Sequence, residues 1–271
     1  MIIAQITDTH IKERGQLAYG VVETAGFLAR AVEHLRGLSP TPDVVLATGD
    51  LVDAGLPEEY RHLRELLAPL PMPVYLIPGN HDDRQALAHE FADHSYLPHR
   101  GFVQYVVEDH PVRLIGLDTL IPGKHGGLLC EERLAWLAAR LAEAPRRPTV
   151  IFMHHPPFIT GILGMDALGL TGAEAMAEIV RRHPQVERVV CGHVHRPIQV
   201  RWGGTVASTA PSTAHQIWLD LREGSRLAFV MEPPACHIHA WWPDTGLITH
   251  TSYIGDFGGP RAFKGGAPIA A

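Results

Sequence analysis

The sequence has few of the features that mark membrane proteins or disulfide-rich proteins. No apolar run is long enough to cross a bilayer, and Met1–Thr9 lacks the pattern of a signal peptide. The three cysteines, Cys130, Cys191 and Cys236, are far apart and form no Cys-x-x-Cys pair, which disfavours a thiolate zinc site and a disulfide framework. We therefore expect a soluble, cytoplasmic protein that does not act at a membrane.

Basic residues are too few and too scattered for a protein that holds long nucleic acid. The chain has 23 Lys and Arg residues against 29 Asp and Glu residues, a formal net charge of −6, and no visible basic cluster. Neutralising the phosphates of a long nucleic acid requires such clusters. Histidine, in contrast, occurs 18 times, which favours imidazole chemistry if several histidines share equivalent positions in the fold.

Apolar runs that alternate with helical patterns predict an α/β fold in the first part of the chain. The runs "IIAQITD", "PDVVLATGD" and "PVYLIPGN" have the pattern of strands, and each precedes a segment with apolar residues at helical spacing. Three strand–helix units in succession indicate a sheet of largely parallel strands. Adjacent strands at "FVQYVVE" and "VRLIGLD", and further strands at "PTVIFMHH" and "VERVVCGH", follow.

The pattern changes after His195. Strand-like runs continue from "PIQVRW" to "LITHTSYI", including "HQIWLDL" and "RLAFVM", with no good helix between them, so we expect antiparallel sheet there. The end of the chain is rich in Gly, Pro and Ala, which is typical of a loose tail. The predicted organisation is a core at residues 1–196, a β-rich extension at 197–254 and a loose tail at 255–271.

Most strands of the predicted core end in side chains that bind metals or carry protons. These side chains are Asp8, His10, Asp50, Asn80, His81, His154, His155, His193 and His195. The carboxyl ends of parallel strands share one edge of a sheet, so these side chains can converge there. Gly49, Gly79 and Gly192 each precede one of them, and a residue without Cβ allows a sharp turn and a close approach.

Seven of these side chains make up a mixed set of oxygen and nitrogen donors: Asp8, Asp50, Asn80, His10, His154, His193 and His195. Such a set suits Zn, Fe, Mn or Co, and it disfavours Ca, Mg or Cu(I). Seven ligands are too many for one ion, whereas a carboxylate has two oxygens and can bridge two ions. We predict a pair of metal ions with Asp50 as the bridge, because its strand lies between the other ligand-bearing strands along the chain.

The segment "IPGNHDD", from Ile77 to Asp83, also has a simpler interpretation as a tight loop whose polar side chains cap a helix. We interpret Asp82 and Asp83 mainly as loop and capping residues that could also orient His81. His155 is interpreted as an outer or structural residue, because successive side chains of an extended segment point to opposite sides.

Five separated motifs in this order, "DTH", "GD", "GNHD", "HH" and "GHVH", resemble those of the calcineurin-like metallophosphoesterases. The resemblance spans Asp8 to His195. "GNHDD" and "STAPSTAHQI" look most like the branch of the bacterial glycerophosphodiesterases and the class III cyclic-nucleotide phosphodiesterases. The Ser/Thr protein phosphatases of this family have Glu after "GNH", so Asp82 argues against that role.

The resemblance implies a four-layer α/β/β/α sandwich and a site with two metal ions. It implies that one ion is held by Asp8, His10, Asp50 and His195, and the other by Asp50, Asn80, His154 and His193. It also implies that the extension at residues 197–254 completes the sandwich and forms subunit contacts in a homo-oligomer, dimeric or higher.

The chemistry we expect is hydrolysis of a small phosphodiester, such as a glycerophosphodiester or a cyclic nucleotide. Two cations about 3.5–4 Å apart can hold a hydroxide for in-line attack. His81 would protonate the leaving oxygen, Asn80 would also contact the substrate, and His215 is either a pocket residue or a structural one. The alternatives are a phosphomonoesterase or nucleotide pyrophosphatase with the same metals, or a non-catalytic scaffold of the same fold.

Overall fold

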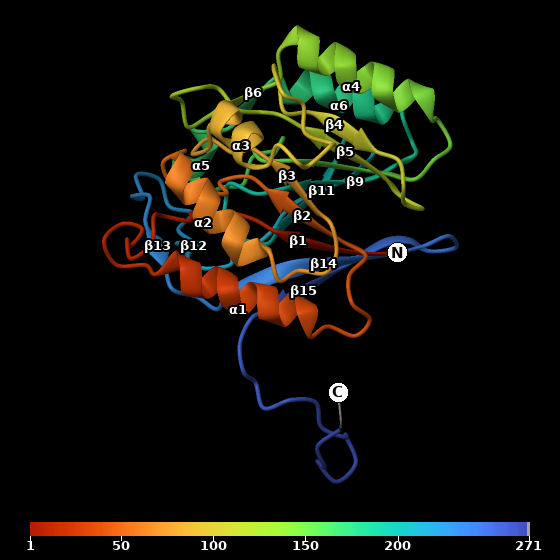
Figure 1. Cartoon of the computed structure of the whole chain (residues 1–271). Helices are drawn as coiled ribbons and strands as arrows, with labels where there is room; N and C mark the ends of the chain where they lie inside the picture. The colour runs from red at the N-terminus through yellow and green to blue at the C-terminus, as the bar shows by residue number, and fades with distance from the viewer. Residues whose placement is uncertain (270–271) are drawn as a thin grey trace.

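Two β-sheets stacked face to face form the centre of the molecule in the computed structural model, which describes residues 1–269 (Figure 1). The first sheet has five strands, in the order β15 (Gly246–Tyr253), β14 (Ala235–Trp242), β1 (Ile2–Ile6), β2 (Val44–Thr48) and β3 (Val74–Ile77). The second sheet has six strands, in the order β10 (Ile198–Trp202), β11 (Thr205–Thr209), β9 (Val186–Cys191), β7 (Thr149–Met153), β5 (Arg113–Leu117) and β4 (Tyr105–Val107).

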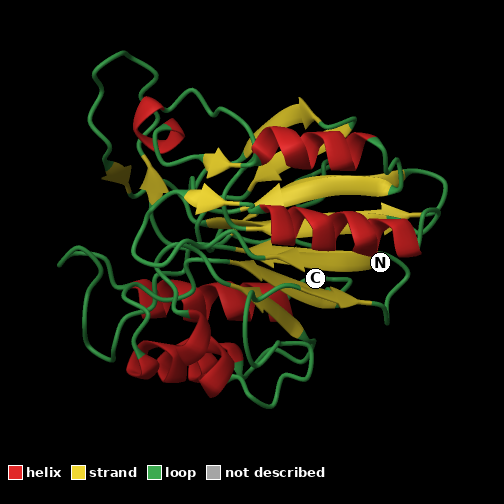
Figure 2. Ribbon diagram, turned by 90° about the horizontal axis from the view of Figure 1, so that it is seen from above, coloured by secondary structure: helices red, strands yellow, loops and turns green. Residues whose placement is uncertain are grey.

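Helices cover the outer faces of the two sheets: in Figure 2 one pair of helices crosses in front of the strands, and another group of helices lies below them. The predicted four-layer α/β/β/α sandwich is thus confirmed. The helices are α1 (Thr24–Arg36), α2 (Pro57–Leu67) and α3 (Arg84–Glu90) beside the first sheet, and α4 (Glu131–Glu143) and α6 (Ala173–Arg181) beside the second (Figure 1). A further short helix, α5 (Leu163–Asp166), was not predicted from the sequence. Within the described residues, no helix combines the length and the apolar character needed to cross a membrane.

Helix α1 illustrates why the periodic segments fold as they do. Its buried residues, Leu28, Ala31, Val32 and Leu35, recur at the spacing of one helix face, which therefore packs on the core. The Glu23 side chain accepts a hydrogen bond from the first turn of the helix, which satisfies one of the free N–H groups at a helix start.

The strand directions agree with the prediction for the core. β1, β2 and β3 run parallel, as do β5, β7 and β9, while β4 and β5 form an adjacent antiparallel pair. Every residue of β2, β5 and β7 is buried. This is expected for parallel strands that are covered on both faces.

The prediction for the C-terminal part was only partly right. Three neighbouring pairs of strands are antiparallel: β10 with β11, β1 with β14, and β14 with β15. In contrast, β11 lies parallel to β9. The runs "HQIWLDL" and "RLAFVM" form only the two-residue strands β12 (Gln216–Ile217) and β13 (Phe229–Val230). The apolar side chains between them, such as Leu219 and Leu221, are exposed, so no buried face supports a longer strand. A second short ribbon consists of β6 (Gly127–Leu128) and β8 (Leu170–Thr171).

The described part of the predicted tail, residues 255–269, is largely exposed and runs away from the sandwich (Figure 1). Its last two residues, 270 and 271, lie outside the described residues.

Gln5 of β1 links the two sheets through buried polar contacts. Its Nε2 donates to the carbonyl oxygen of Cys191 in β9 at 2.9 Å, across the space between the sheets. Its Oε1 lies 3.1 Å from Nε2 of His239 in β14. These bonds satisfy polar groups that would otherwise be costly to bury, and they fix the relative position of the sheets close to the strand ends.

His237, also in β14, is fully buried, and neither of its ring nitrogens has a hydrogen-bond partner among the described residues. Burial, with a smaller effect from Arg188, lowers the pKa of His237 from 6.5 to about 4. The folded protein therefore holds this imidazole neutral, whereas the unfolded chain binds a proton below pH 6.5. We expect the stability contributed by neutral His237 to be lost as the pH falls from about 6.5 towards 4.

The test compares the free energy of unfolding of the wild type and of His237→Leu between pH 7.5 and 4.5. A shift of this size corresponds to at most about 3 kcal/mol, so the wild-type curve should fall more steeply with acid than that of the variant. Parallel curves would show that His237 does not titrate with unfolding.

Candidate metal centre

The predicted donor side chains meet at one edge of the sandwich. They come from the loops that follow β1, β2 and β3 of the first sheet and β7 and β9 of the second sheet. All seven are brought together, and all but the half-buried Asn80 are buried: Asp8, His10, Asp50, Asn80, His154, His193 and His195. The site therefore lies where the carboxyl ends of both sheets face each other.

The backbone is strained at most of these positions. Six non-glycine residues within 1–269 have positive φ, and five of them belong to the donor set: Asp8 (52°), His10 (43°), Asp50 (46°), His193 (70°) and His195 (50°). The left-handed region is unfavourable for residues with a Cβ. Strain of this kind persists where the surrounding structure enforces it and is concentrated at functional sites. Here it accompanies loops that turn at the strand ends.

Oxygen acceptors determine which nitrogen of three histidines faces the site. Nδ1 of each of these imidazoles lies within hydrogen-bond reach of an oxygen that can only accept a hydrogen bond. Two of these oxygens are backbone carbonyls, and the third belongs to a carboxylate in its ionised form. The contacts are His10 with the Asp53 carboxylate at 3.3 Å, His154 with the Thr48 carbonyl at 2.9 Å, and His195 with the His215 carbonyl at 3.0 Å. Nδ1 therefore carries the proton, and in the neutral ring the lone pair on Nε2 points into the site.

Around Asp8 these lone pairs come close together. Nε2 of His10 lies 3.3 Å from Nε2 of His195 and 3.7 Å from Oδ2 of Asp50, and Nε2 of His195 lies 3.3 Å from Oδ1 of Asp8. The donor atoms of Asp8, His10 and Asp50 all lie within 4.8 Å of one another. This is one group of converging acceptors.

A second group gathers around His154. Its Nε2 lies 3.2 Å from Oδ1 of Asn80 and 3.3 Å from Oδ2 of Asp50. Nε2 of His193 is buried without a hydrogen-bond partner among residues 1–269, and the His193 ring lies 5.1 Å from that of His154. Asp50 is therefore close to both groups, in the position expected of a bridging carboxylate.

Acceptors that face acceptors in a buried space require a proton or a cation between them. Burial disfavours the charged form of His154, but the Asp50 carboxylate outweighs it and raises the pKa of His154 to about 9. Burial also opposes the charge of Asp50, yet His154 and other imidazoles hold its pKa well below the usual value. Neutral imidazoles, carboxylates and an amide oxygen together fit transition-metal cations, which could replace the protons that otherwise offset this crowding.

The glycines before the donors make room for the side chains of neighbouring loops. A Cβ on Gly49 would lie 2.5 Å from Nδ1 of His154, and one on Gly192 would lie 2.9 Å from Oδ2 of Asp8. A Cβ on Gly79 would overlap Asp50 and lie 2.8 Å from Cε1 of His154. At these three glycines, the missing Cβ therefore allows other parts of the protein to approach the backbone closely.

His81 stands at the edge of the site and is half-buried. Its backbone N–H donates to Oδ1 of Asp50 at 2.9 Å, and its Nδ1 donates to the carbonyl of Asp53 at 2.7 Å, which leaves Nε2 available. The hydrogen bonds do not support the expectation that Asp82 or Asp83 orients His81. Asp53 orients the ring, because the loop after β2 lies against it.

Asp83 is the N-cap of α3, as predicted, but Asp82 has another role. Its buried carboxylate accepts hydrogen bonds from the backbone N–H groups of Leu51, Val52 and Gly79 and from the Tyr60 hydroxyl. Burial and the nearby Asp50 raise the pKa of Asp82 to about 7. Asp82 therefore ties the loop after β2 to the loop after β3.

Sequence reasoning missed Asp53. Its carboxylate contacts Nδ1 of His10 and pairs with Nζ of Lys12 at 2.8 Å, while its carbonyl holds His81. Burial opposes its charge, but the bonds to His10 and Lys12 lower the pKa of Asp53 well below 3.8. The available signal was its position three residues after Asp50, on the same loop.

His155 and His215 surround the donor set. Nε2 of His155 donates to the His125 carbonyl at 3.0 Å and its Nδ1 accepts from the Thr119 hydroxyl at 2.8 Å, so both nitrogens are engaged. Burial lowers the pKa of His155 to about 3 and that of His215 to about 2. The His215 ring is buried beside that of His10, and its carbonyl orients His195.

Gly79→Ala should weaken metal binding by about 10- to 100-fold, the range seen when groups that support metal ligands are changed. The added methyl group would displace Asp50 and His154. Metal retained after competition with a chelator measures the effect. Gly37→Ala is the control, because its Cβ would make only ordinary contacts, the nearest at 3.5 Å. Unchanged metal affinity in Gly79→Ala would contradict this account.

Comparison with known proteins agrees with this fold. The chain is 44% identical over 264 residues to a probable glycerophosphodiester phosphodiesterase GpdQ of Arcobacter nitrofigilis, covering 97% of each chain. It is 31% identical to the 3',5'-cyclic adenosine monophosphate phosphodiesterase CpdA of Escherichia coli, covering 79% of this chain and 76% of the other.

A solved structure of a dimetal phosphatase from Danio rerio has a similar fold, with a TM-score of 0.62 and 17% identity over 94% of this chain and 99% of that one. Residues 1–197 match the calcineurin-like phosphoesterase family. With this match and the close relatives, the chain belongs to the calcineurin-like phosphoesterases, on the branch of the glycerophosphodiesterases and class III cyclic-nucleotide phosphodiesterases.

Proposed function

We propose that this protein hydrolyses small phosphodiesters, such as glycerophosphodiesters or cyclic nucleotides, with two transition-metal ions. It is a metal-dependent phosphodiesterase of its branch, a phosphoric diester hydrolase. The observation that carries the finer proposal is the convergence of seven donors from both sheets, with Asp50 between two groups of acceptors.

In this proposal Asp8, His10, Asp50 and His195 hold one ion, and Asp50, Asn80, His154 and His193 hold the other. The ions are Fe, Mn, Zn or Co, which suit nitrogen and oxygen donors. When bound, they would supply a nucleophilic water at neutral pH and stabilise the charge of the phosphate in an in-line displacement. Asp50, which lies close to both donor groups, would contribute to catalysis as a ligand of both ions.

His81 has the geometry of a general acid for the leaving group. Its Nδ1 is engaged by the Asp53 carbonyl, so Nε2 can donate to a leaving oxygen. The carboxylates of Asp50 and Asp53 raise the pKa of His81 despite the opposing effect of burial, which favours the protonated form. We propose that Asn80 and His81 contact the phosphate, and that the His215 ring borders the substrate.

The charges near the site favour a diester over a monoester. A monoester carries close to two negative charges near neutral pH, so a site that selects it should offer unpaired Arg or Lys. The nearby basic residues are paired instead: Lys12 with Asp53, Arg84 with Asp118, and Arg196 with Glu232. Phosphomonoesters and nucleotide pyrophosphates are therefore the second candidates, and the intact donor set argues against a non-catalytic scaffold.

We also propose a homo-oligomer, dimeric or higher, in which residues 197–254 form subunit contacts. β15 lies at the edge of the first sheet with one side unpaired among the described strands, and Trp242, Ile248 and Tyr253 expose large apolar side chains there. A cytoplasmic location is likewise a proposal, supported by three free cysteines, which suit a reducing compartment.

His81→Ala should keep its metal content but lose about 10²- to 10⁴-fold in turnover of diesters with poor leaving groups. A good leaving group needs little protonation, so the loss on 4-nitrophenyl diesters should be much smaller. The measurement is kcat for a series of leaving groups in the wild type and the variant. Equal losses across the series would exclude His81 as the acid.

The substrate preference is tested with a 4-nitrophenyl diester and 4-nitrophenyl phosphate, which share one leaving group. At matched metal content and pH, kcat/KM should be higher for the diester, because Lys12, Arg84 and Arg196 are engaged in ion pairs and do not offer their charge to a second negative charge on the phosphate. A clear preference for the monoester would favour the second candidate function.

A further inference from the structure

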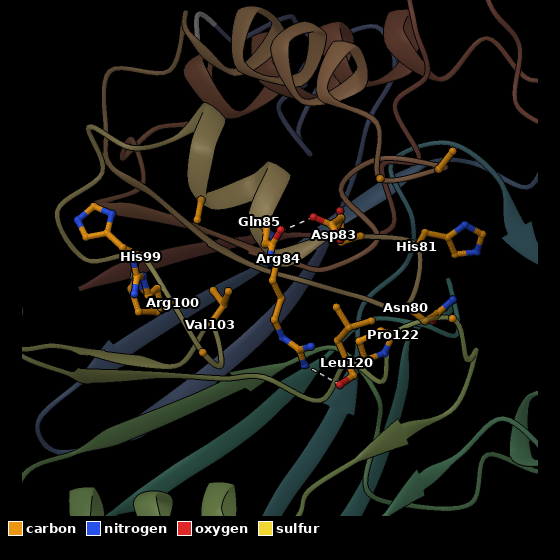
Figure 3. A pocket seen from close by; sticks show the side chains of 17 residues that line it. Asn80, His81, Asp83, Arg84, Gln85, His99, Arg100, Val103, Leu120 and Pro122 are labelled. Atoms are coloured by element: carbon orange, nitrogen blue, oxygen red, sulfur yellow. Dashed lines mark hydrogen bonds between the residues drawn. The ribbon is translucent and has the colours of Figure 1, made fainter.

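A large pocket opens beside the candidate general acid. It has a volume of about 800 Å³ and is bordered by Asn80 and His81 at one end. The start of α3 and the loops around residues 98–103 and 120–123 form its walls. Figure 3 shows His81 and Asn80 on one side of this pocket, and His99 and Arg100 on the opposite side. The volume lies within the range of small-molecule sites and exceeds what a small alcohol such as ethanolamine needs.

The charged groups of the pocket are separated along its length. The carboxylates of Asp82 and Asp83 follow His81 directly in the chain, so they lie at the end next to the metal centre. The basic side chains Arg84, His99 and Arg100 line the rest. An anionic group on a ligand would be attracted towards the basic residues at the far end of the pocket.

The guanidinium of Arg84 is engaged in contacts within the protein. It forms a bidentate pair with Asp118 at 2.6 and 2.8 Å and donates to the carbonyl of Leu120 at 2.6 Å. Arg133 packs behind it, and both guanidinium groups lie over the ring of Phe102. This wall is therefore built as a rigid unit.

Arg100, in contrast, is exposed and forms no hydrogen bond or ion pair with any other residue of the described chain. Among the arginines that line the pocket, it is the one whose charge is available to a ligand.

We propose that this pocket binds the leaving alcohol of the phosphodiester, and that Arg100 selects alcohols with an anionic group at their far end. The inference depends on the proposed function. Asn80 and His81, which we propose to contact the phosphate, border this pocket, so the pocket is the adjoining space that the rest of the alcohol can occupy. An alcohol long enough to place a carboxylate or phosphate near Arg100 gains a charge-assisted contact.

Two glycerol phosphodiesters that differ in charge but hardly in shape test the charge preference: those of 4-hydroxybenzoate and of 4-hydroxybenzamide. The purified, Mn²⁺-loaded protein is assayed for kcat/KM on each, and the ratio of carboxylate to amide substrate is compared between variants. Arg100→Gln should lower this ratio about fivefold, the upper range for an exposed ion pair. Arg100→Glu should lower it further, and both effects should shrink at high salt.

Arg146→Gln is the matched control, because Arg146 is also exposed and lies between α4 and the start of β7, at the opposite edge of the sheet. It should leave the ratio unchanged.

Ala88→Phe narrows the pocket. It should lower kcat/KM for both aryl diesters but not for glycerophosphoethanolamine, whose leaving alcohol is small.

A ratio that stays constant in both Arg100 variants would overturn the role of Arg100. Equal effects of Ala88→Phe on large and small leaving groups would overturn the assignment of the pocket. Failure of the proposed function looks different, since the wild-type protein would then hydrolyse none of these diesters.

Discussion

The structure depends on one electrostatic constraint, the crowding of hydrogen-bond acceptors around Asp50 in a space that is almost closed to water. Nε2 atoms of His10 and His154 approach the same carboxylate oxygen, at 3.7 and 3.3 Å, with their Nδ1 protons engaged elsewhere. Such an arrangement is unfavourable unless positive charge lies between the acceptors. The donor set therefore fits a cation site, and the raised pKa of His154 shows that a proton meets the same demand.

Holding these atoms together requires the two sheets to be joined at their carboxyl edges. His154 of the second sheet donates to Thr48 of the first, and the backbone N–H of His193 donates to the Asp8 carboxylate at 3.0 Å. Gln5 makes a third link across the interface. Left-handed backbone at five donor positions costs on the order of 1–3 kcal/mol each, and this network enforces that strain. The metal centre and the packing of the sandwich are thus one structural unit.

The surroundings of the centre divide the tasks of catalysis among different loops. The loop after β2 provides Asp53, which orients His10 and His81, and so links a metal-facing imidazole to the candidate acid. The loop after β3 places His81 at the border of the pocket, and Asp82 ties this loop to the loop after β2. Groups that lie in the walls of the pocket, such as Arg84, are engaged in building it, so our proposal assigns substrate selection to a residue on its rim, Arg100.

The sequence by itself determined the α/β class, the parallel strands and which side chains gather at the strand ends, because periodicity and the residues that follow a strand are local properties. It did not determine the roles of Asp53 and Asp82, the short β12 and β13, or the pocket that joins His81 to Arg100. These were decided by the tertiary structure, since they depend on contacts between distant positions. The bond from His154 to Thr48, for example, spans 106 residues, and only the stacking of the two sheets brings its partners together.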